Sequence, residues 1–75
     1  MHSFVIAYDL SNASSTRYKE VVSMLSGIGA EHRQKSVWVL NSADYDLDTV
    51  HFCMSLVMTD NDDLFVVPII SEWII

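Results

Sequence analysis

Apolar residues in the first part of the chain predict a strand followed by a helix. Residues 4–8 form a short apolar run rich in strand-preferring types, and Asp9 closes it. After a small polar loop over residues 11–15, apolar side chains recur at helical spacing, at Tyr18, Val21, Val22, Leu25 and Ile28. Gly27 and Gly29 are typical of a helix end. We therefore expect a buried strand that ends at Asp9 and a helix that ends at the glycines.

The middle of the chain is strand-like from residue 30 to residue 40. Periodicity alone suggests one strand here. A hairpin within the stretch is also compatible with the pattern, although no Asn-Gly or Asp-Gly pair marks a two-residue turn. Residues 41–46 have the composition of a loop. The strand boundary near Lys35 stays open at this point.

A second helix and a last strand are predicted in the remainder of the chain. From Leu47 onward, one helical face is formed by Val50, Met54 and Val57, widened by Leu56 and Met58. The acidic stretch 60–63 ends this helix. Residues 64–70 then read as a strand, and Pro68 favours an edge position because proline has no backbone N–H to donate.

With the middle stretch split into two strands, the order of elements is β-α-β-β-α-β. This order predicts a single α+β domain over residues 1–75, a ferredoxin-like two-layer sandwich. Many unrelated activities share this architecture, so the order of elements indicates little about function.

Composition indicates an oligomer outside the membrane. The chain has 75 residues, 51% of them hydrophobic. Domains of this size bury only about 60% of the surface of the unfolded chain, so a monomer would be marginally stable and we expect an oligomer.

The longest uncharged run, residues 49–59, is too short for a membrane-spanning helix, which needs about 20 apolar residues. The first residues lack the basic and apolar pattern of a secretory signal, so we expect the cytoplasm.

Charge is unevenly distributed, although the net charge is −6. The basic residues all lie in the first half, at Arg17, Lys19, Arg33 and Lys35. These are the candidates for contacts to phosphate groups. The second half is purely acidic and would repel a polyanion unless a metal ion or the basic residues intervened.

Three local strings carry a resemblance to a known family. They are Tyr8-Asp9-Leu10-Ser11, Gln34-Lys35-Ser36-Val37-Trp38 and Asp63-Leu64-Phe65-Val66-Val67-Pro68. In order and spacing they resemble the small CRISPR-associated endonuclease family, the second and smaller protein of the spacer-integration complex. That family reads Tyr-Asp-Ile-Ser, then Gln-x-Ser-Val-Phe, then an acidic residue before the final hydrophobic strand. Arg17 and Gly29 fit the family's intermediate Arg and Gly, so the resemblance covers nearly the whole chain.

The resemblance implies a homodimeric, metal-dependent endonuclease of antiviral defence that acts on RNA or DNA. By position, Asp9 is the catalytic and metal-binding residue, and one Asp9 from each chain holds Mg²⁺ or Mn²⁺ across a two-fold axis. Ser36, Trp38 and Trp73 fall at the dimer interface, and residues 71–75 correspond to a C-terminal segment exchanged between subunits. A larger integrase protein is the implied partner.

Two alternatives remain open from the residues alone. The low number of basic residues favours a non-catalytic dimeric scaffold that binds a partner protein through its acidic face. The sheet architecture is also similar to that of virulence-associated protein D toxins, which are ribonucleases. The string from Gln34 to Trp38 favours the CRISPR-associated group over the toxins.

Overall fold

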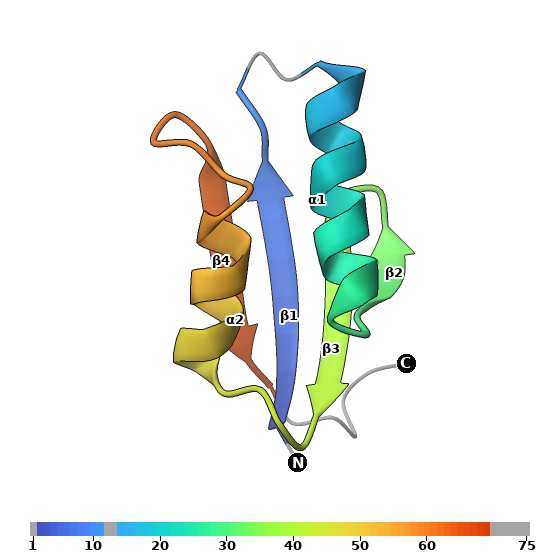
Figure 1. Ribbon diagram of the computed structural model, residues 1–75. Helices are drawn as coiled ribbons and strands as arrows, with labels where there is room; N and C mark the ends of the chain where they lie inside the picture. The colour runs from blue at the N-terminus through green and yellow to red at the C-terminus, as the bar shows by residue number, and fades with distance from the viewer. Residues whose placement is uncertain (1, 12–13, 70–75) are drawn as a thin grey trace.

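The structure, a computed structural model, describes residues 2–11 and 14–69. These residues form four strands and two helices in the predicted order (Figure 1). The elements are β1 (His2–Asp9), α1 (Ser15–Gly27), β2 (Glu31–Gln34), β3 (Val37–Ser42), α2 (Leu47–Ser55) and β4 (Asp63–Pro68).

The four strands form one sheet in the order β2-β3-β1-β4, in which every pair of neighbours is antiparallel. Both helices lie on the same face of this sheet (Figure 1). The predicted ferredoxin-like architecture is therefore confirmed. β1 lies in the interior of the sheet, as its apolar sequence predicted, and β4 lies at an edge, as Pro68 predicted.

The hydrophobic core lies between the sheet and the helices. Alternate residues of β1, namely Phe4, Ile6 and Tyr8, point into it and are at most 6% exposed. α1 contributes Val21 and Leu25 to the core, while α2 contributes Val50 and Met54 and β3 contributes Trp38 and Leu40. The apolar strand runs and the helical spacing seen in the sequence thus supply the residues of one core.

The opposite face of the sheet, here called the open face, is covered by neither helix. The strand registers place six apolar residues on it: Val5, Ala7, Val37, Val39, Phe65 and Val67. The Phe65 side chain is 65% exposed and Val67 is 46% exposed. An apolar face of this kind is typical of a surface that another molecule covers.

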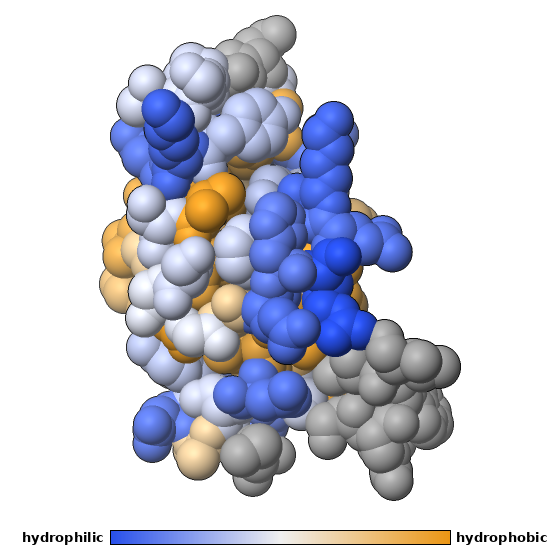
Figure 2. Space-filling model, turned by 90° about the vertical axis from the view of Figure 1, so that its right-hand side faces the viewer, coloured by the Kyte–Doolittle hydropathy of each residue, from blue (hydrophilic) through white to orange (hydrophobic). Residues whose placement is uncertain are grey.

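The edge of the sheet that β2 forms is polar. All residues of β2 are exposed and polar, with the sequence Glu-His-Arg-Gln. Figure 2 views the molecule from this side and shows hydrophilic side chains over the β2 edge. Charged side chains on an edge strand discourage pairing with the strand of another molecule.

Two boundaries differ from the sequence predictions, and the question of a hairpin near Lys35, which the sequence left open, is answered. The stretch over residues 30–40 is a hairpin, because Lys35 and Ser36 form a turn between β2 and β3. The second helix ends at Ser55, earlier than the predicted end at residues 60–63, and Leu56 beyond it is 63% exposed, so its predicted place on the apolar helical face was wrong. The last strand ends at Pro68, and Ile69 beyond it is not part of the strand, so the predicted end at residue 70 was wrong. Trp73 and the predicted exchange segment 71–75 lie outside the described residues.

None of the helices in residues 2–11 and 14–69 is long and apolar enough to cross a bilayer.

Gly29 should be sensitive to substitution because it has a φ of +87° after the end of α1. A Cβ placed there would meet no atom within 4 Å, so the cost of Gly29→Ala arises in the backbone alone. We expect a loss of about 1–2 kcal/mol and a drop in Tm of roughly 5–15 °C. Gly27→Ala is the matched control, because Gly27 is the last residue of α1 and also has free space. Thermal denaturation should show no loss for Gly27→Ala, and equal losses in both variants would contradict the backbone explanation.

Candidate functional site

Asp9 is the last residue of β1, and its exposed side chain lies on the open face. Directly opposite, in the register of β1 with β4, lies Asp63, which is also exposed. Opposed residues of antiparallel strands have Cα atoms about 4.5–5.5 Å apart, and two like charges in this position repel each other. The strand pairing therefore places two carboxylates side by side at one end of the sheet.

These two carboxylates are the acidic side chains that the strand register brings together at this end of the sheet. Among residues 2–11 and 14–69, no group of three or more His, Cys, Asp or Glu side chains is close enough to hold a metal ion. Carboxylate oxygens are the ligands that Mg²⁺ uses in proteins, usually one or two together with water. Asp9 and Asp63 thus have the donor chemistry of a magnesium site. A second copy of the chain would add a second pair of carboxylates.

A cavity of about 470 Å³ lies beside Asp9. Its walls are Tyr8, Asp9, Leu10, Tyr18, Lys35 and Ser36. The fold thus brings together three residues that the sequence analysis selected separately, Asp9, Lys35 and Ser36. The lining also contains Tyr18 of α1, which the sequence analysis had assigned only to the helix periodicity.

The β2–β3 turn is held in place by the rings of His32 and Trp38. These rings stack with their centroids 4.1 Å apart and their planes within 5°. His32 Nε2 donates to the carbonyl oxygen of Lys35 at 3.0 Å, which assigns the proton to that nitrogen. On the other side, the backbone N–H of Tyr8 donates to the carbonyl of Ser36 at 3.3 Å. The turn that carries Lys35 and Ser36 is therefore fixed against the end of β1.

A charged contact between Arg17 and Asp62 holds the other side of the site. The side chain of Asp62 accepts hydrogen bonds from the Arg17 guanidinium and from the backbone N–H groups of Ser11 and Thr59, both at 2.8 Å. Arg17 and these N–H groups hold the pKa of Asp62 well below its usual range. Arg17 therefore ties the loop before β4 to the start of α1 and to the residues that follow Asp9.

Loss of the Asp62 charge should destabilise the fold in a pH-dependent way. Because the pKa of Asp62 is lower in the folded state than its ordinary 3.8, the charge stabilises the fold above that value. The stabilisation is lost as pH falls through the folded pKa. We expect Asp62→Asn to have a lower Tm than wild type above about pH 5, with a difference that shrinks below about pH 4.

Asp60→Asn is the control for this measurement, because Asp60 is an exposed acid of the same loop. Thermal denaturation between pH 3 and pH 7 should show little difference between this control and wild type. A Tm difference for Asp62→Asn that stays constant down to pH 3 would contradict the role of its charge.

The other predicted residues lie in different surroundings. Trp38 is 3% exposed and belongs to the core on the helix side, where its Nε1 donates to the hydroxyl of Tyr8 at 3.3 Å. Arg33 donates to Glu31 Oε1 at 3.2 Å on the β2 edge. Lys19 lines a more open hollow of about 650 Å³ along α1, away from Asp9. That hollow contains Glu20 and Met24 but none of the residues of the Asp9 cavity.

Sequence reasoning had missed the roles of Asp62 and Tyr18. The sequence predicts Asp62 only as part of the acidic stretch 60–63 that ends the second helix, yet its side chain is fully buried. Its partner Arg17 is 45 positions away in the chain, so no local pattern could have revealed the pair. Tyr18 fitted the helical period, and only its 45% exposure separates it from the core residues.

Comparison of the sequence with known protein families and with curated proteins gives no match.

Proposed function

We propose that the protein is a homodimeric, divalent-metal-dependent endonuclease similar to the small CRISPR-associated endonucleases. The observation that carries this proposal is the exposed Asp9 at the end of β1, paired with Asp63 and placed beside a cavity that contains Lys35. Cleavage of a phosphodiester uses a carboxylate that holds the metal ion and a cationic side chain that contacts the phosphate, and Asp9 and Lys35 offer both beside one cavity.

The open face supports the dimer. It carries exposed apolar side chains on the same side of the sheet as Asp9. If two chains pack through this face with the two-fold axis beside Asp9, the apolar residues are buried and the two carboxylate pairs meet. Four carboxylates then surround one position, which is sufficient for a hard cation.

In this arrangement, Asp9 and Asp63 of both chains hold the cation, and Lys35 contacts a phosphate of the substrate. A divalent cation bound there, Mg²⁺ or Mn²⁺, supplies activation of water and neutralisation of the phosphate charge. Ser36 contributes a hydroxyl group at the wall of the same cavity. RNA and DNA phosphodiesters both fit this chemistry.

The test is cleavage of labelled single-stranded RNA and duplex DNA with Mg²⁺, with Mn²⁺ and with a chelator, together with light scattering. We expect a dimer that cleaves at least one substrate only when a divalent cation is present. Cleavage that persists in chelator, or activity in a strictly monomeric protein, would contradict the proposal.

A second candidate function is a non-catalytic scaffold for another protein. The net charge of −6 disfavours binding to a polyanion, and α2 presents Phe52, which is 63% exposed, close to the similarly exposed Leu56. An exposed aromatic side chain next to an exposed aliphatic one is typical of a protein contact. A stable dimer without cleavage of either substrate in any cation would favour this function.

A further inference from the structure

We propose that the cavity beside Asp9 is a binding pocket for one unpaired nucleotide, with the ring of Tyr18 stacking on the base and Lys35 contacting the phosphate. The inference rests on the proposed function only for the cleavage step, because binding in this pocket needs neither a metal ion nor catalysis. The ligand chemistry is a nucleobase joined to a phosphate. Its source is either a single strand or a free nucleotide.

The lining of the cavity supports this ligand class. A volume of about 470 Å³ falls within the range of about 300–1,000 Å³ that is typical of small-molecule sites. The lining residues include an aromatic residue, Tyr18, an apolar residue, Leu10, and a basic residue, Lys35. Aromatic rings stack on any base, and a nearby cation attracts the backbone, which is how proteins bind unpaired nucleotides.

Tyr18 has the exposure that stacking requires. It lies near the start of α1 and is 45% exposed, although it belongs to the apolar periodicity of that helix. The second tyrosine of the cavity, Tyr8, is different: it is 6% exposed and its hydroxyl accepts a hydrogen bond from Trp38. Tyr8 therefore forms a fixed wall, and Tyr18 offers the accessible ring.

The walls of the pocket are held in place before any ligand binds. The stacked His32 ring and its hydrogen bond to the Lys35 carbonyl fix the turn. The contact of Arg17 with Asp62 fixes the start of α1, which carries Tyr18. A preformed pocket spares the ligand the entropy cost of ordering these segments.

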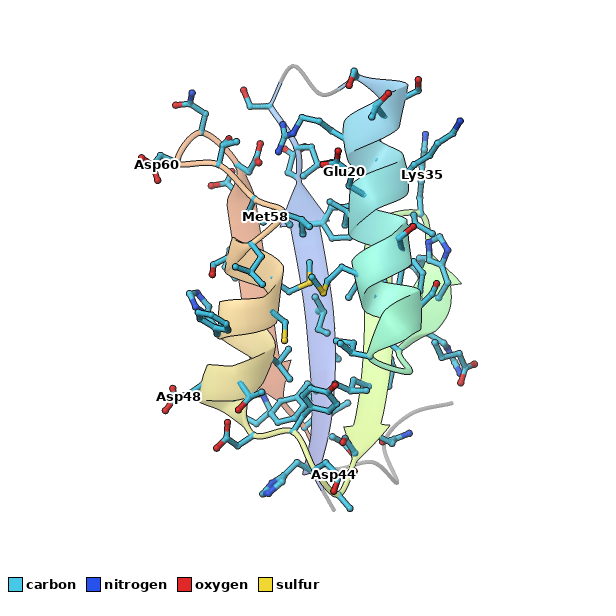
Figure 3. All side chains as sticks on the ribbon, in the orientation of Figure 1. Glu20, Lys35, Asp44, Asp48, Met58 and Asp60 are labelled. Atoms are coloured by element: carbon cyan, nitrogen blue, oxygen red, sulfur yellow. The ribbon has the colours of Figure 1, made fainter. Side chains whose placement is uncertain are left out.

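The charges of Asp9 and Lys35 determine which side of the cavity the phosphate of the bound nucleotide occupies. Asp9 repels a phosphate when no cation is present, so the phosphate belongs on the Lys35 side of the cavity. Figure 3 shows Lys35 beside α1 at the end of the sheet where β1 ends, with Asp44 and Asp48 at the opposite end of the molecule. The acidic residues at the start of α2 are thus remote from this pocket.

The experiment measures binding in chelator, so that no cleavage occurs. Calorimetry with nucleoside monophosphates tests the free nucleotide, and fluorescence anisotropy with a labelled four-nucleotide RNA and with a hairpin duplex tests the strand. We expect the single strand to bind better than the duplex. Binding of the monophosphates in addition would identify a free nucleotide as a ligand, and binding of the oligonucleotide alone would identify the strand.

Tyr18→Leu should weaken binding about 10-fold or more, because it removes the stacking ring but keeps a good helix former. Tyr18→Phe should bind like wild type. Lys35→Ala should reduce the slope of log K against log salt by about 0.7, the value for one phosphate contact on a single strand. Lys35→Arg is its control, because arginine keeps the positive charge at this position and should keep the wild-type slope.

Two results would contradict the proposed nucleotide pocket: equal affinity of Tyr18→Leu and Tyr18→Phe, or no binding of any of these probes to wild type.

Asp9→Asn separates the two proposals, because it removes repulsion from the pocket and should bind the four-nucleotide RNA in chelator at least as tightly as wild type. Retained binding without metal-dependent cleavage in wild type would refute the nuclease and leave the nucleotide pocket standing.

Discussion

Asp9→Asn should reduce metal-dependent cleavage about 100-fold or more while leaving the dimer intact. The change keeps the volume of the side chain but removes its charge, and two-fold symmetry removes that charge twice. Residues that only support a metal ligand typically cost 10–100-fold when they are changed. Loss of a direct ligand from both chains should therefore cost at least as much. Initial cleavage rates in Mg²⁺ and Mn²⁺, with light scattering on the same samples, measure both parts of the prediction.

Asp48→Asn is the control for Asp9→Asn. Asp48 is an exposed acid in the first turn of α2, and it lies at the far end of the molecule from Lys35 (Figure 3). This variant should cleave at the wild-type rate. Cleavage that persists at the wild-type rate in Asp9→Asn would refute the role of this carboxylate, and equal losses in both variants would indicate a general effect of charge.

Phe65→Lys should convert the proposed dimer into a monomer. Phe65 is 65% exposed in the single chain, so burial at an interface would stabilise the dimer by about 1–2 kcal/mol from each chain. Phe65 of both chains lies in the proposed interface, so this burial free energy is lost twice. The dissociation constant should therefore rise roughly 100-fold. Lysine is common on edge strands and faces solvent there without strain, so the fold itself should persist. Light scattering over a range of protein concentrations, with circular dichroism, checks both expectations.

Phe52→Lys is a close match to this variant, because Phe52 is 63% exposed but lies on α2 and not on the open face. It should remain a dimer with wild-type activity, while Phe65→Lys should lose cleavage together with dimerisation. A monomer produced by Phe52→Lys alone would place the interface on the helix side. A Phe65→Lys monomer that still cleaves would contradict the shared metal site.

The periodic parts of the sequence predicted the fold well, for a physical reason. The apolar run of β1 and the helical spacing of Val21 and Leu25 indicate which parts of each element are buried, and burial is what the fold must satisfy. The hairpin at Lys35 was left open, because its turn lacks the residues that mark a two-residue turn. Leu56 was placed wrongly, because apolar character alone does not reveal where a helix ends.

The candidate site was predictable only where its residues fall at the ends of strands. Asp9 follows an apolar run, and an acid in that place is visible in the sequence. The pairing of Asp9 with Asp63 depends on the register between β1 and β4, which the sequence leaves undetermined. The burial of Asp62 against Arg17 depends on the path of two loops, for which there is no periodic signal.

The difference between the edges and the open face of the sheet bears on how far this protein can assemble. The β2 edge is charged and polar, and β4 includes Pro68, so extension of the sheet by further strands is disfavoured on either side. Under the proposed function the open face pairs with its own copy, and a face that binds its own copy about a two-fold axis is fully covered once two chains have paired. Such assembly closes at two chains, so raising the concentration should saturate the dimer and not lead to filaments.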